Sequence, residues 1–130
     1  MGISILLVED SRATRALVVS TLEELGQITI VEADNGFAAL KALPASRFDL
    51  IITDVNLPEI TGLEIVRFVK GNPQYKHIPV LIISTQQAAA DIQRGLSLGA
   101  SAYLGKPFKP EQLKATVQSL LPPAQGVSVA

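Results

Sequence analysis

The chain has 130 residues, of which 48% are hydrophobic and 18% are charged, and its formal net charge is −1. Because basic residues are not in excess, we expect no direct binding to nucleic acid and none to an anionic membrane surface. The absence of cysteine excludes disulfides, zinc fingers and thiol catalysis.

Short apolar runs rich in Ile, Val and Leu alternate with amphipathic segments, which predicts alternating strands and helices. In chain order they are strand 3–8, helix 11–26, strand 28–33, helix 35–44, strand 49–54, helix 61–72, strand 78–84, helix 89–100, strand 100–105 and helix 109–122. The first helix has an apolar stripe of Ala13, Leu17, Leu22 and Leu25, and the third has one of Leu63, Val66 and Val69.

The C-terminal residues 122–130 carry no helical stripe, so we expect one folded domain over 1–121 and a frayed tail over 122–130. The apolar run at the N-terminus stops at Glu9, and no run is long enough to span a bilayer. These features are typical of a cytoplasmic protein.

Strict alternation of five strands with five helices predicts an α/β fold with a parallel sheet, right-handed crossovers and helices on both faces. Five strands fit the flavodoxin-like order 2-1-3-4-5. In such folds ligands bind at the carboxyl ends of the strands, beside the switch in strand order.

Polar side chains follow four of the five predicted strands. Because the carboxyl ends of parallel strands meet at one edge of the sheet, we expect these side chains to lie close together. They are Glu9 and Asp10 after the first strand, Asp54 and Asn56 at the third, Ser84 and Thr85 at the fourth, and Lys106 after the fifth.

Three carboxylates in one small site require compensating positive charge. Two carboxylates about 4 Å apart repel by roughly 4 kcal/mol at an effective dielectric constant of about 20. Lys106 offsets part of this repulsion, and oxygen ligands without His or Cys favour Mg²⁺, with Mn²⁺ possible. We expect the ion to be held by Glu9, Asp10, Asp54 and the main-chain carbonyl of Asn56.

Such a site suits phosphoryl transfer, whose transition state spreads negative charge over three oxygens. Asp54 is the predicted nucleophile, since carboxylates can form aspartyl phosphates. Lys106 and the Ser84 hydroxyl are predicted to bind phosphoryl oxygens.

Four separated motifs, "VEDS", "DVNLPEITGLE", "IPVLIIST" and "GASAYLGKPF", together resemble the response-regulator receiver domain of the CheY type. The resemblance extends from residue 3 to about residue 121. It implies a two-component or phosphorelay switch in which Asp54 accepts a phosphoryl group from a histidine kinase or a histidine phosphotransfer protein, with Mg²⁺. Such a domain is a signalling phosphoacceptor that assists its own phosphotransfer and autodephosphorylation, and not an enzyme in the usual sense.

The resemblance also implies how the signal leaves the domain. Ser84 moves toward the phosphoryl group and Tyr103 turns inward, which remodels a docking face formed by helix 89–100, strand 100–105 and helix 109–122. The Lys106–Pro107 bond is expected to be cis. Asn56 and Gln86 are expected to tune removal of the phosphoryl group by water. A downstream protein docks on the remodelled face.

Several alternatives remain open at this point. The chain is either a stand-alone regulator or a receiver module excised from a hybrid histidine kinase or a multi-domain regulator. A Mg²⁺-dependent phosphatase of the haloacid dehalogenase type, a docking module that has lost phosphorylation and a flavodoxin-like FMN carrier fit the motifs less well. Thr85 departs from the small residue that is frequent in the family, and the lone His77 is expected in a solvated loop.

Overall fold

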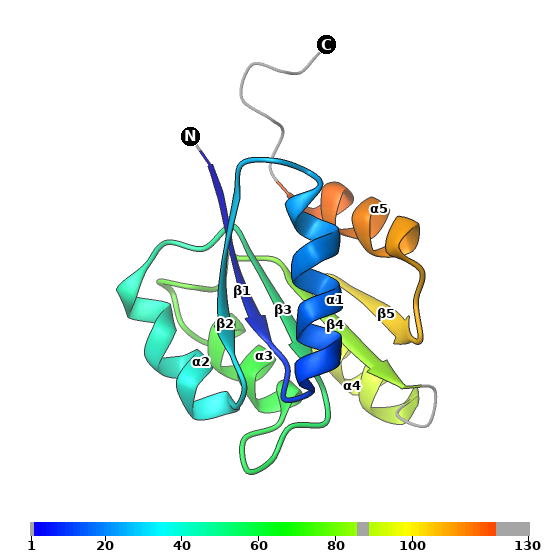
Figure 1. The fold of residues 1–130 in the computed structure, drawn as a ribbon. Coiled ribbons are helices and arrows are strands. Elements are labelled where there is room, and N and C mark those ends of the chain that lie inside the picture. Colours follow the sequence, from blue (N-terminus) through cyan, green and yellow to red (C-terminus); the bar gives the residue numbers. More distant parts are fainter. Residues whose placement is uncertain (1, 86–88, 122–130) are drawn as a thin grey trace.

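The computed structural model describes residues 2–85 and 89–121 and is an α/β fold (Figure 1). The predicted tail 122–130 and Gln86 lie outside the described residues. The strands are β1 (Ile3–Val8), β2 (Ile28–Ala33), β3 (Leu50–Asp54), β4 (Val80–Thr85) and β5 (Ala102–Lys106). The helices are α1 (Arg12–Glu23), α2 (Gly36–Ala42), α3 (Gly62–Lys70), α4 (Ala89–Leu98) and α5 (Pro110–Leu120), and a 3-10 turn spans Leu43–Ala45.

The five strands form one parallel sheet in the order β2-β1-β3-β4-β5, as the sequence predicts. All five strands run the same way, so their carboxyl ends lie at one edge, here called the carboxyl edge, and their starts at the opposite amino edge (Figure 1). The strand order switches at β1 and β3, which are neighbours in the middle of the sheet. A ligand site is expected at the carboxyl edge beside this switch.

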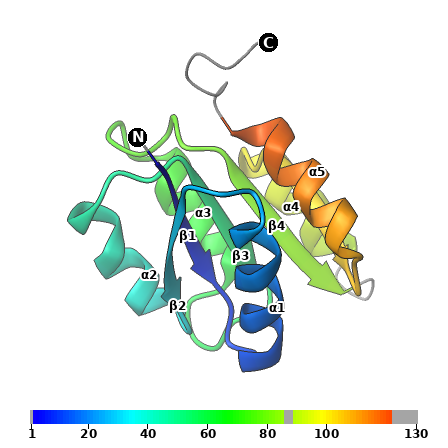
Figure 2. The ribbon, with the colours of Figure 1, turned by 45° about the horizontal axis from the view of Figure 1, so that its top comes forward.

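Helices cover both faces of the sheet. α1 and α5 pack side by side on one face, and α2, α3 and α4 lie on the other (Figure 2). Side chains alternate along each strand, so Ile5 and Leu7 join the cluster under α1 and α5, whereas Leu6 and Val8 join the cluster under α2 and α3. Both faces of the central strands are therefore buried, which explains their continuous apolar runs.

The predicted apolar stripes are right for α3 and partly wrong for α1. Leu63, Val66 and Val69 are all buried in the core under α3. In α1 the buried residues are Val18, Thr21 and Leu22, while Leu17 is 41% exposed and Ala13 is exposed. Both Leu17 and Val18 fit a helical repeat, and only packing against the sheet decides between them.

The boundaries of several elements also differ from the prediction. α1 ends at Glu23 rather than at residue 26, because the chain turns through left-handed conformations at Gly26 (φ 76°) and Gln27 (φ 51°). β4 begins at Val80 rather than at residue 78, since Pro79 has no N–H to donate to a neighbouring strand. Across the described part of the chain, no helix is both long and apolar enough to cross a membrane.

Candidate functional site

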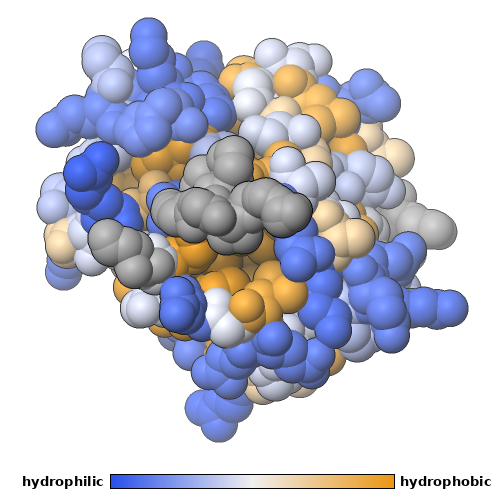
Figure 3. Space-filling model, turned by 90° about the horizontal axis from the view of Figure 1, so that it is seen from above, coloured by the Kyte–Doolittle hydropathy of each residue, from blue (hydrophilic) through white to orange (hydrophobic). Residues whose placement is uncertain are grey.

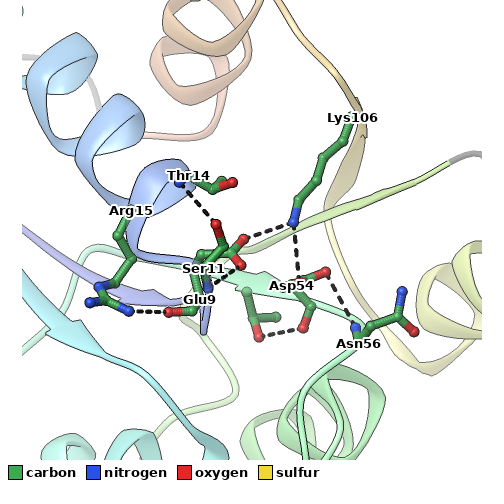
Figure 4. Close-up of polar contacts among 8 residues, drawn as sticks. Glu9, Ser11, Thr14, Arg15, Asp54, Asn56 and Lys106 are labelled. Carbon is green, nitrogen blue, oxygen red and sulfur yellow. Dashed lines mark hydrogen bonds and ion pairs between the residues drawn. The ribbon is translucent and has the colours of Figure 1, made fainter.

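The centre of the site is a lysine that binds two carboxylates from different strands. Lys106 Nζ, at the end of β5, donates to Glu9 Oε1 at 2.9 Å and to Asp54 Oδ2 at 3.2 Å (Figure 4). Glu9 follows β1 and is fully buried, and Asp54 ends β3 and is only 4% exposed. The fold thus brings together three residues that are up to 97 positions apart in the sequence.

The electrostatics of these groups follow from burial and from their charges. Burial raises the pKa of Glu9, and the charge of Asp54 raises it further, while the Lys106 ammonium and the Ser11 N–H lower it; the net shift is upward. Burial lowers the pKa of Lys106, but its hydrogen bond to Glu9 and the charges of Asp54 and Glu9 outweigh burial, so the net shift is upward. Lys106 is therefore held in its charged form.

The start of α1 fixes the Glu9 side chain. The Ser11 N–H donates to Glu9 Oε2 at 3.0 Å. Ser11 is also the N-cap of α1, and its hydroxyl accepts from the Thr14 N–H at 3.2 Å (Figure 4). The helix start thereby orders the loop that carries both acidic residues after β1.

The loop after β3 approaches Asp54 closely. The Asn56 N–H donates to Asp54 Oδ1 at 3.3 Å, and the Gly62 N–H donates to the Val55 carbonyl at 3.0 Å. A Cβ at position 62 would overlap the Asp54 carbonyl oxygen, so only glycine allows this approach. Gly62 therefore helps to set the position of Asp54.

Three acidic side chains at the carboxyl edge can share one metal ion. Glu9, Asp10 and Asp54 each offer a carboxylate oxygen, and these oxygens all lie within 4.8 Å of one another. Three carboxylates against one ammonium leave an uncompensated negative charge, and oxygen ligands of this kind suit Mg²⁺ or Mn²⁺. The donor set thus fits a hard divalent cation.

Ser84 supplies a second sign that the site takes a ligand. Among the buried side-chain nitrogen and oxygen atoms of residues 2–85 and 89–121, the Ser84 hydroxyl is the one that lacks a hydrogen-bond partner. Ser84 is fully buried, and its neighbour Thr85 pairs in register with Lys106. Since a buried hydroxyl without a partner costs free energy, this atom is available to a ligand that supplies an oxygen.

Three further predictions concern Tyr103, the Lys106–Pro107 bond and His77. Tyr103, on β5, is 41% exposed, so in this structure its ring is not turned inward. The Lys106–Pro107 bond is cis, as expected. His77 is exposed in the loop before β4, in agreement with the prediction.

The sequence reasoning missed two residues that support the site, Gly62 and Arg15. Arg15 Nη1 donates to the Glu9 main-chain carbonyl at 2.8 Å (Figure 4). One signal was available for Arg15: the residue four positions after the N-cap Ser11 lies one turn into the helix, on the side of the cap. The role of Gly62 had no signal beyond the glycine itself.

Comparison with known proteins places this geometry in a family. Residues 5–118 match the model of the response regulator receiver domain. The chain is 35% identical over 118 residues to the chemotaxis protein CheY1 of Helicobacter pylori, covering 90% of this chain and 95% of the relative.

Solved structures agree with the match. The chemotaxis response regulator CheY4 of Vibrio cholerae superposes with a TM-score of 0.85 and 38% identity, covering 93% of this chain and 100% of that one. The receiver domain of a sensor histidine kinase of Pseudomonas aeruginosa, solved with a magnesium ion coordinated in its active-site cleft, has a TM-score of 0.83 and 27% identity. That alignment covers 92% of this chain and 98% of the other.

Proposed function

The chain belongs to the response-regulator receiver family, and we propose that Asp54 is the residue on which it accepts a phosphoryl group. The donor is a phosphohistidine on a histidine kinase or a histidine phosphotransfer protein. An Asp54 carboxylate oxygen attacks phosphorus as the phosphorus–nitrogen bond breaks, and the electron pair of that bond returns to the histidine ring. The observation that carries the proposal is the buried Asp54 carboxylate paired with Lys106 at the carboxyl edge.

The residues around Asp54 have separate tasks in this reaction. Lys106 and the partnerless Ser84 hydroxyl bind phosphoryl oxygens. Glu9, Asp10 and Asp54 would hold Mg²⁺, or Mn²⁺ in its place, together with the main-chain carbonyl of Asn56. A cation there would supply charge neutralisation for the phosphoryl oxygens. The magnesium found in the Pseudomonas aeruginosa receiver supports this assignment.

The output is a change on the face formed by α4, β5 and α5. When the Ser84 hydroxyl binds a phosphoryl oxygen, the space around it alters, and Tyr103 turns from its exposed position toward it. Exposed Leu96 and Leu98 on α4 and Tyr103 on β5 support a docking face for a downstream protein. Asn56 and Gln86 tune how long the phosphoryl group survives attack by water, and Thr85 narrows access to it.

We propose that the chain acts as a stand-alone regulator, and its likeness to the CheY-type relatives supports this reading. The alternative is a receiver module of a hybrid histidine kinase or a multi-domain regulator, and the likeness to the Pseudomonas aeruginosa kinase receiver supports it. The coding region of the chain in its genome distinguishes them. A kinase or output domain in the same reading frame would establish the alternative.

The proposal is tested by intact mass after incubation with acetyl phosphate and Mg²⁺. We expect one phosphoryl group per chain, and we expect its loss in Asp54→Asn and after addition of a chelator. Asp49→Asn is the matched control, since Asp49 precedes the same strand at the amino edge and accepts from the Ser4 N–H at 2.9 Å. It should be phosphorylated as the wild type is.

Two results would contradict the proposal. An adduct that persists in Asp54→Asn would place the acceptor elsewhere. A folded wild-type protein that forms no adduct with acetyl phosphate and does not bind beryllofluoride would be a docking domain without phosphorylation.

A further inference from the structure

Arg15 connects three parts of the molecule that meet beside the acidic site. Its Nη1 donates to the Glu9 main-chain carbonyl at 2.8 Å, and its Nε lies 3.3 Å from Glu32 Oε1 on β2. The Arg15 side chain is only 18% exposed. In Figure 4 it reaches from α1 to the backbone of Glu9, on the side away from Lys106.

The carbonyl that Arg15 binds belongs to the peptide group joining Glu9 to Asp10. On the other side of Glu9, its own N–H donates to the Ala33 carbonyl of β2 at 3.0 Å. The backbone of Glu9 is therefore fixed at both its N–H and its carbonyl, and Arg15 provides the second of these bonds. The direction in which Asp10 leaves the strand depends on that peptide group.

Asp10 depends on its backbone for its position. Its side chain is exposed, and within residues 2–85 and 89–121 its carboxylate makes no hydrogen bond and no ion pair. The Glu9 carboxylate, in contrast, is held by Lys106 and by the Ser11 N–H. The main chain therefore determines where the Asp10 carboxylate lies, and with it the distance between the Glu9 and Asp10 carboxylates.

The charge of Arg15 works against a cation in this site. A guanidinium bonded to the Glu9 main-chain carbonyl repels a metal ion held by the neighbouring carboxylates, and its pairing with Glu32 removes only part of that repulsion. A benefit of Arg15 to metal binding must therefore come from geometry. If the charge of Arg15 dominates, removing Arg15 should strengthen Mg²⁺ binding, and if its geometric role dominates, removing it should weaken Mg²⁺ binding. A measurement of Mg²⁺ affinity therefore distinguishes the two effects.

We propose that Arg15 is a positioning residue for metal binding, which fixes the Glu9–Asp10 peptide group and so holds the two carboxylates at the spacing that a divalent cation needs. This inference rests on the phosphoacceptor site proposed above. Groups that orient metal ligands through hydrogen bonds typically change metal affinity by about 10- to 100-fold when they are mutated.

The test measures the dissociation constant of Mg²⁺ by calorimetric titration of the full chain. Arg15→Ala should bind Mg²⁺ about tenfold more weakly than the wild type. Arg15→Lys retains the charge and one donor and should recover part of the affinity. Glu32→Gln removes the ion pair but leaves the bond to the Glu9 carbonyl, and should change the affinity less than Arg15→Ala does.

Arg12→Ala is the matched control. Arg12 is an exposed arginine on the same helix, and no hydrogen bond or ion pair holds it within the described part of the chain. Its removal deletes the same charge and should leave Mg²⁺ affinity unchanged or slightly higher. Urea unfolding of the metal-free variants shows whether each is folded, and Arg15→Lys carries the test if Arg15→Ala is not.

The outcomes are distinct. Weaker Mg²⁺ binding in Arg15→Ala, with partial recovery in Arg15→Lys, supports the positioning role. Equal or tighter binding in a folded Arg15→Ala overturns it, even if the metal-free protein is destabilised, because a merely structural contact changes stability and not affinity. If Arg15→Ala does not fold, equal or tighter binding in Arg15→Lys overturns it. A folded wild type that binds no Mg²⁺ would instead overturn the proposed function.

Discussion

The two edges of the sheet each hold a half-buried lysine that makes two hydrogen bonds. At the carboxyl edge Lys106 donates to the carboxylates of Glu9 and Asp54. At the amino edge Lys70 Nζ donates to the main-chain carbonyls of Lys76 at 3.0 Å and Ile78 at 2.7 Å. The lysines differ mainly in whether their partners carry charge.

That difference shifts the pKa values of the two lysines in opposite directions. Burial lowers the pKa of Lys70, and its neutral carbonyl partners do not restore it. Burial acts on Lys106 in the same direction, but two carboxylates outweigh it and the pKa is raised. Charged partners, and not hydrogen bonds to neutral carbonyls, offset the effect of burial on the pKa of a lysine.

The amino edge also holds a cavity. A cavity of about 550 Å³ opens at the amino edge, lined by residues of the 43–49 and 74–79 segments, among them His77. Viewed from this edge, apolar residues are visible near the centre and hydrophilic ones lie toward the rim (Figure 3). Within the described ranges, the cluster of acidic residues able to hold a metal lies at the other edge. This cavity and the acidic cluster thus lie at opposite edges of the sheet.

The largest expected effect comes from removing each lysine in turn. Lys106→Met leaves two buried carboxylates without a cation and should lower the free energy of unfolding by about 3 kcal/mol. This value is at the low end for broken buried ion pairs because the Lys106 side chain is 19% exposed. Lys70→Met loses two bonds to neutral carbonyls and should cost about 1–2 kcal/mol. Urea unfolding in the presence of a chelator measures both.

Urea unfolding in the presence of Mg²⁺ should distinguish the two lysine variants further. The cation should restore stability to Lys106→Met and should not change the cost of Lys70→Met. Equal costs for the two variants, with and without Mg²⁺, would remove the distinction between charged and neutral partners.

Replacing a glycine at each edge by alanine should have a smaller effect on stability. Gly62→Ala places a methyl group against the Asp54 carbonyl and should cost about 2 kcal/mol while slowing phosphorylation. Gly26→Ala meets no atom within 4 Å but must adopt a φ of 76°, and should cost about 1 kcal/mol. Phosphorylation by acetyl phosphate should be unchanged in Gly26→Ala. If it slowed equally in both, general destabilisation would explain the result.

The smallest effect is the pH dependence of the two lysines. The raised pKa of Lys106 gives stability that is fully present below the unfolded value of about 10.5 and is lost as pH rises through the folded pKa. The lowered pKa of Lys70 has the opposite sign, since stability rises with pH between its folded pKa and about 10.5. Titration of lysine side-chain NMR signals measures both pKa values. If the two pKa values were shifted in the same direction, the contrast between the two lysines would be wrong.

Much of the fold and the site could be predicted from the sequence. The alternation of apolar runs with helical patterns predicted a parallel sheet in the observed order. A parallel sheet brings the carboxyl ends of its strands together, so Glu9, Asp54 and Lys106 could be placed in one site from their positions after strands. This prediction depends only on local periodicity and on the direction of the strands.

Other features were decided by the tertiary structure. Leu17 and Val18 both fit a helical stripe, and the sheet surface selected Val18 for burial. The ion pair of Arg15 with Glu32 joins α1 to β2 and depends on how the helix packs beside that strand. The close approach of Gly62 to Asp54 likewise depends on how the loop after β3 folds back.

The sequence by itself therefore determined which chemical groups share the carboxyl edge, because residue type and strand direction are local properties. Only the tertiary structure decided which backbone atoms and helix faces hold those groups in place. The physical reason is that hydrogen bonds and packing change over a few tenths of an ångström, which the repeat of apolar residues along the chain does not specify.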